Sequence, residues 1–112
     1  MSRDMKPRHP LRIRRRFEVR YGEPGGERFT GFSGNISSNG IMIRTGRVFG
    51  EGVLLEMELK MPRGSIHLKG RVRWARQGSV QLLSSGRIGM GIVLVNPPAD
   101  LLASLDAQTG QP

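Results

Sequence analysis

Two polar segments of this sequence contain residue types that bind anions. Residues 12–16 hold four arginines and no acidic residue. Residues 35–40 read Asn-Ile-Ser-Ser-Asn-Gly, and a β-branched segment begins at Ile41. Short polar side chains hydrogen-bond to their own backbone and favour turns, and a glycine permits positive φ or a close approach. Together the segments predict a rigid polar turn at the mouth of a sheet, next to an arginine-rich anion pocket.

The spacing within these segments resembles the paired signature of PilZ domains, which are bacterial receptors for cyclic di-GMP. That signature is RxxxR, a first strand, and then D/NxSxxG. The resemblance covers about residues 11–108 and continues through residues 66–74 and 89–93. It implies a cytoplasmic second-messenger receptor whose ligand-binding residues are Arg12, Arg15, Arg16, Asn35, Ser37 and Gly40.

Each residue type suits cyclic di-GMP, which has two phosphates and two guanines. Arginine binds phosphate through two hydrogen bonds, pairs with the O6 and N7 edge of guanine and stacks on bases, whereas lysine supplies only the charge. A carboxylate at the position of Asn35 would accept from two guanine N–H groups, whereas asparagine offers one carbonyl oxygen. Ser37 would donate to a phosphate or base oxygen, and Gly40 would set the turn and clear space.

The first motif has two possible frames, Arg12 with Arg16 and Arg16 with Arg20. We prefer the first, because a strand pattern at residues 17–21 follows it. In that frame Leu11 stands where many members carry another arginine, and the link to Asn35 is a few residues short. These departures leave open a degenerate PilZ-like adaptor that binds a protein partner and no nucleotide.

Alternating apolar residues predict an all-β fold. The pattern indicates strands at residues 17–21, 27–32, 41–45, 53–61, 66–75, 80–83 and 88–94, and a short helix that starts after Asn96. Periodicity does not decide between a sandwich and a barrel. The resemblance implies a six-stranded antiparallel Greek-key β-barrel with a short C-terminal α-helix. Phe17, Tyr21, Phe29 and Trp74 are expected to point inward.

The 112 residues suffice for one domain, over residues 11–108, with a flexible basic tail at 1–10 and a frayed end at 109–112. The net charge is +9, and residues 1–20 supply +6 of it, from eight Lys or Arg and two acids. A localised anion is therefore the expected partner, and nucleic acid, an anionic membrane face and a nucleotide all qualify.

The composition also limits other functions. There is no cysteine and no long apolar run, which fits a cytoplasmic protein without a membrane span. The two histidines are isolated, and no acid is spaced to pair with a histidine or nucleophile, so we expect neither a metal, a cofactor nor an enzyme. A nucleic-acid-binding barrel stays open, but few aromatics (5%), expected to point inward, count against it.

Overall fold

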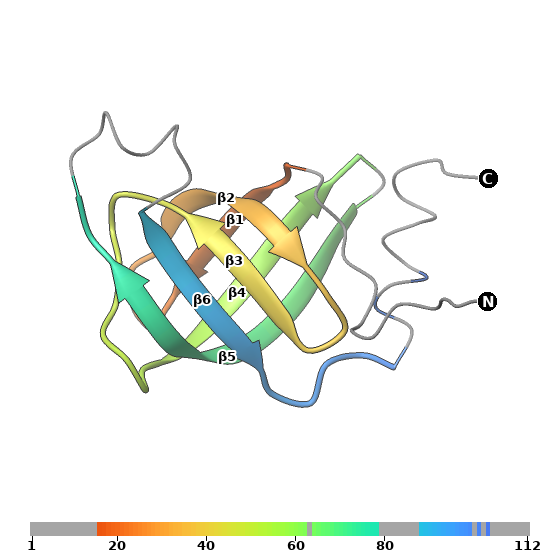
Figure 1. Ribbon diagram of the computed structural model, residues 1–112. Helices are drawn as coiled ribbons and strands as arrows, with labels where there is room; N and C mark the ends of the chain where they lie inside the picture. Colours follow the sequence, from red (N-terminus) through yellow and green to blue (C-terminus); the bar gives the residue numbers. More distant parts are fainter. Residues whose placement is uncertain (1–15, 63, 79–87, 100, 102, 104–112) are drawn as a thin grey trace, which may run out of the picture.

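The computed structural model describes residues 16–62, 64–78, 88–99, 101 and 103, and six strands there form a closed antiparallel barrel (Figure 1). The strands are β1 (Glu18–Gly22), β2 (Phe29–Ile36), β3 (Gly40–Arg44), β4 (Leu54–Met61), β5 (Gly64–Arg76) and β6 (Gly89–Leu94). Their order is β1-β2-β3-β6-β5-β4, and β4 pairs with β1 to close the barrel. Because β4 returns beside β1 after the β1-β2-β3 meander, the topology is a Greek key. The predicted six-stranded barrel is confirmed.

The core follows the period-2 alternation of the strands. On β4, Leu55, Met57 and Leu59 are buried while the residues between them are half-buried. The same alternation buries residues of the other strands. The barrel interior contains Val19, Tyr21, Ile41, Ile43, Leu55, Met57, Leu59, Leu68, Val72, Met90, Ile92 and Leu94.

The second strand is longer than its pattern predicts. The sequence indicates a strand at residues 27–32, but β2 continues to Ile36, which pairs with Ile41 across a register shift. Asn35 therefore belongs to the strand, and the turn is confined to residues 37–39. Phe29 is only half-buried; its ring lies 6.1 Å from that of Tyr21 and 5.9 Å from that of Phe49, measured between centroids.

Trp74 does not point into the core, contrary to the sequence prediction. Val72 is opposite Ile92, but Trp74 is opposite the next residue, Gly91, so Arg73 is an extra residue on β5. Such a β-bulge reverses which face the following side chains occupy. The indole consequently lies on the outer face, where 40% of Trp74 is exposed.

Some predicted features lie outside the described residues. They are the tail at 1–10, Arg12 and Arg15, the strand at 80–83, most of the C-terminal helix and the end at 109–112. They stay predictions. Among the residues that are described, no helix is long and apolar enough to span a bilayer.

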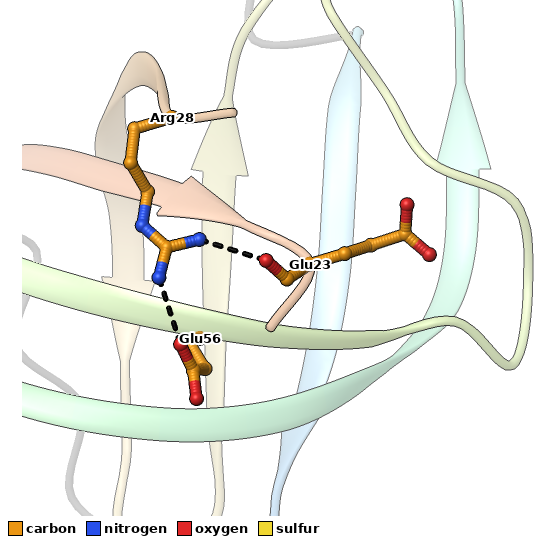
Figure 2. A network of polar contacts seen from close by, with 3 residues as sticks. All are labelled: Glu23, Arg28 and Glu56. Atoms are coloured by element: carbon orange, nitrogen blue, oxygen red, sulfur yellow. Dashed lines mark hydrogen bonds and ion pairs between the residues drawn. The ribbon is translucent and has the colours of Figure 1, made fainter. Parts of the chain in front are cut away.

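Figure 2 shows how the β1–β2 turn is joined to the neighbouring strand. Arg28 donates to the carbonyl oxygen of Glu23 at 2.9 Å and forms an ion pair with Oε1 of Glu56 on β4 at 2.7 Å. Both charged side chains are about a third exposed, so the ion pair stabilises the fold by about 1 kcal/mol at most. This contact lies at the barrel end opposite to the 37–39 turn.

A substitution of Tyr21 would test the packing at that end of the barrel. Its hydroxyl is buried, donates to the carbonyl of Arg47 and shares a hydrogen bond of 2.7 Å with Oγ1 of Thr45. Tyr21→Phe removes both bonds and leaves their partners without the hydroxyl. The free energy of unfolding should fall by about 1–3 kcal/mol, which denaturant titration measures. An unchanged midpoint would contradict this packing.

The same residue predicts a pH effect. Burial raises the pKa of Tyr21 above the ordinary 10.0, against the opposing effects of Thr45 and Arg47. Because the unfolded chain loses its proton first, this contribution to stability is complete below about pH 10 and is lost as pH rises through the folded-state pKa. The stability difference between wild type and Tyr21→Phe should therefore shrink above pH 10. A difference independent of pH would show that Tyr21 does not titrate as a buried group.

Candidate functional site

The polar turn predicted at residues 35–40 is closed by its own hydrogen bonds. The backbone N–H of Ser37 donates to the carbonyl of Gly40 at 2.9 Å, and Oγ of Ser37 donates to Oδ1 of Asn39 at 3.1 Å. The carbonyl of Asn39 accepts from the N–H of Leu94 at 3.0 Å. The turn is thus held against the end of β6, and its side chains have a fixed place beside that strand.

Gly40 matters for this turn because it has no side chain, and not because its φ is positive. It begins β3 and is absent from the described glycines with positive φ, so of the two roles that a glycine permits here, positive φ or a close approach, the structure shows the close approach. A Cβ there would lie 3.2 Å from the carbonyl oxygen of Ile92. The missing side chain lets β3 approach β6 closely.

The turn forms one end of a groove of about 270 Å³ on the outer barrel face. Three residues in a row across neighbouring strands line the groove: Gly91 of β6 lies between Met42 of β3 and Trp74 of β5. The groove is lined by Asn35, Ser37, Gly40, Ile41, Met42, Arg73, Trp74, Gly91, Ile92 and Val93. The structure therefore brings three of the predicted site residues together in one cleft.

Arg73 and Trp74 are groove residues that the sequence reasoning missed. A Cβ on Gly91 would lie 2.0 Å from Nε1 of Trp74, so the indole rests directly on the backbone of β6. The Gly-x-Gly alternation at residues 89–91 signals such a close approach, but it does not identify the side chain that fills the space. Without the bulge, alternation would turn Trp74 into the barrel, so the indole would not face the groove.

Arg16 is exposed and lies at the same end of the barrel as the turn. The N–H of Ser33 donates to the carbonyl of Phe17 at 2.8 Å, which extends the β1–β2 pairing beyond Glu18, and the N–H of Phe17 donates to Oγ of Ser33 at 2.9 Å. Arg16, which precedes Phe17, therefore lies toward the end of β2 that carries Asn35. The Arg16 guanidinium lies 4.1 Å from the ring centroid of Phe32, and neither of these two residues lines the groove.

Arg20, the alternative arginine of the first motif, lies elsewhere. It pairs with Thr30 and Glu58 and lines a different groove, of about 700 Å³, together with Arg28 and Lys69. Arg20 is four positions after Arg16 in the chain, which corresponds to about 13 Å of extended backbone.

The groove at the turn is electropositive. Arg73 lines it, and none of the described residues lining it is acidic. In the described part of the chain, no three His, Cys, Asp or Glu side chains gather where they could hold a metal ion. A cationic cleft with an exposed indole and amide and hydroxyl groups at one end is suited to a ligand that combines phosphates with planar bases.

Comparison with solved structures shows the same fold in PilZ proteins. The chain is similar to the inhibitor of motility MotI/DgrA of Bacillus subtilis, with a TM-score of 0.64 and 20% identity, covering 96% of this chain and 51% of that one. It therefore spans about half the length of that protein. It is also similar to the PilZ domain of CeSA from a cellulose-synthesizing bacterium, with a TM-score of 0.60 and 14% identity, covering 89% of this chain and 96% of that one.

A comparison with curated proteins found no match. The family model of the PilZ domain matches residues 6–110, nearly the whole chain. With the barrel topology and both structural neighbours in agreement, the chain belongs to the PilZ domain family.

Proposed function

We propose that this protein is a non-enzymatic receptor for cyclic di-GMP, the ligand that membership of the PilZ family implies. The observation that carries the proposal is the convergence of Asn35, Ser37 and Gly40 on one groove, opposite the exposed Trp74. Arg16 precedes β1 at the same end of the barrel and is the last residue of the arginine-rich segment at residues 12–16. The location of Arg20 in another groove supports the frame Arg12 with Arg16.

The proposed roles follow from the chemistry of the side chains. Arg12, Arg15 and Arg16 bind phosphate and guanine edges, and the carbonyl of Asn35 accepts from a guanine N–H. The indole of Trp74 offers a stacking surface for one base, a contact that contributes about 1–3 kcal/mol. Ser37 donates its hydroxyl to a ligand oxygen.

Calorimetric titration tests the ligand class. Cyclic di-GMP should bind with a micromolar or lower dissociation constant, which corresponds to about −8 kcal/mol or better. GMP should bind far more weakly, because it supplies one base and one phosphate. Equal affinity for cyclic di-GMP, GTP and GMP would show a nonspecific anion site and contradict the proposal.

Ser37→Ala should weaken cyclic di-GMP binding by about 1–2 kcal/mol, the scale of a hydrogen bond to a charged group. Among the described residues, the Ser37 hydroxyl makes one contact of 3.1 Å and two of 3.5 Å, so it is available to a ligand. Ser65→Ala is the matched control, because Ser65 is exposed on β5 and does not line the groove. Equal affinities of the two variants would remove Ser37 from the site.

We also propose that the ligand draws the arginine segment onto the turn, and that a partner protein responds to this ordered state. Such a switch requires the ligand to bind the two states with different affinities. Amide exchange with and without cyclic di-GMP should show new protection confined to about residues 11–17 and 34–41. If protection at residues 11–17 is the same in both samples, the switch is wrong although the receptor function stands.

One observation favours a second candidate. Because Trp74 is exposed beside Arg73, the argument that the aromatic residues point inward no longer excludes single-stranded nucleic acid. An oligonucleotide that binds more tightly than cyclic di-GMP, with a steep salt dependence, would favour it. A folded protein that binds neither ligand would be a protein-interaction adaptor.

A further inference from the structure

The outer surface of β5 and β6 carries an apolar row that extends beyond the nucleotide groove, because Trp74 and Val93 line that groove and Val95 does not. Among the described residues, the large apolar side chains that stay exposed are Trp74 (40%), Val93 (41%) and Val95 (39%). Val93 pairs across the sheet with Arg71, and the N–H of Val95 donates to the carbonyl of Lys69 at 2.8 Å. We call the surface formed by Lys69, Arg71, Trp74, Val93 and Val95 the β5–β6 face.

Cations border this row on one side and no acid interrupts it. β5 contains Lys69, Arg71, Arg73 and Arg76 and no acidic residue, and β6 contains no charged residue at all. Glu56 is opposite Lys69, but on β4, the far side of β5 from the valines, and it is paired with Arg28. The face therefore combines apolar side chains with unbalanced positive charge.

The backbone beneath the face is already paired. β6 hydrogen-bonds to β3 on one side and to β5 on the other, so no strand can be added there. Any partner must therefore bind through the side chains of the outer barrel surface. Valines provide no stacking surface for nucleobases, whereas aliphatic side chains, a tryptophan and bordering cations are the set that enters the headgroup region of an anionic bilayer.

We propose that the β5–β6 face docks this protein onto anionic lipid bilayers, with Trp74, Val93 and Val95 entering the headgroup region and the β5 cations contacting acidic lipids. The proposal goes beyond nucleotide binding and does not depend on it. Trp74 and Val93 also line the nucleotide groove, but Lys69, Arg71 and Val95 do not, so substitutions at these last three residues separate the two functions.

Vesicle sedimentation with the ligand-free full chain tests the proposal. The protein should bind equimolar phosphatidylcholine–phosphatidylglycerol vesicles and not pure phosphatidylcholine vesicles. Trp74 is the single tryptophan of the chain, so its fluorescence reports contact at this face. Its emission should shift to the blue on binding. Binding through the basic residues 1–20 alone would leave the emission unchanged and would overturn the proposal.

Two variants and a matched control localise the contact. Lys69→Glu changes the charge by two units and should weaken vesicle binding about 30-fold, on the scale of about 1 kcal/mol per charge near an anionic surface. Val95→Ser should weaken it several-fold. Lys60→Glu makes the same charge change on β4, outside the face, and should have a much smaller effect. All three should keep wild-type affinity for whatever nucleotide the groove binds.

Equal losses for Lys69→Glu and Lys60→Glu would mean that overall charge, and not this face, drives binding, and would overturn the proposal. Polyglutamate and a single-stranded oligonucleotide are the rival polyanions. If either produces the Trp74 blue shift while the anionic vesicles produce none, the face binds a different class of partner and the membrane proposal is wrong.

Discussion

Arg16→Ala should abolish measurable cyclic di-GMP binding and leave the barrel folded. Charge-assisted hydrogen bonds contribute about 1.5–3 kcal/mol each, so the loss of a two-pronged contact should lower affinity about 100-fold or more. Arg16 is exposed and precedes β1, and its contact with Phe32 is an exposed cation–π pair that stabilises by about 0.5–1 kcal/mol. Calorimetry should thus show lost binding, while thermal unfolding shifts only slightly.

Arg20→Ala is the matched control for this result. Arg20 lies on β1, the strand that Arg16 precedes, and is also exposed, but it lines the groove with Arg28 and Lys69. Its replacement should leave nucleotide affinity close to wild type. If Arg20→Ala abolishes binding and Arg16→Ala does not, the motif frame is wrong and the ligand binds on the other side of β1.

Gly70→Ala should produce a large loss of stability. Gly70 is buried where β5 pairs with β6, and a Cβ there would lie 2.4 Å from Cγ2 of Ile92 and 2.6 Å from the carbonyl oxygen of Val93. The backbone cannot move aside without disturbing the ladder, so we expect a loss of about 3 kcal/mol in the free energy of unfolding. Denaturant titration measures it directly.

Gly50→Ala makes the same chemical change where there is room. No atom lies within 4 Å of a Cβ built at Gly50, and its φ is not positive. Its unfolding free energy should stay within about 0.5 kcal/mol of wild type. Similar stabilities for the two variants would contradict the close packing of β5 on β6.

The barrel was largely predictable because its signals are local. Alternation along residues 53–61 and 88–94 places Leu55, Met57 and Ile92 in the core, as observed. The polar turn was also predictable, since Asn and Ser followed by Gly favour turns wherever they occur. The motif residues Asn35, Ser37 and Gly40 do share one groove.

Other features depend on contacts between distant segments. The bulge at Arg73 follows from how β5 pairs with β6, and no local pattern predicts it, so Trp74 was assigned to the core. The extension of β2 through Asn35 likewise depends on pairing with β3. The sequence left open whether Gly40 supplies positive φ or a close approach, and the tertiary contact with Ile92 shows that it is the close approach.

Chemical-shift mapping of isotope-labelled protein during titration with cyclic di-GMP tests the central claim most directly. We predict saturable changes at the amides of residues 35–40, at Gly91 and at the indole N–H of Trp74, because these groups surround the groove. Changes confined to the groove of Arg20, Arg28 and Lys69, with the turn and Trp74 unaffected, would contradict the proposed site.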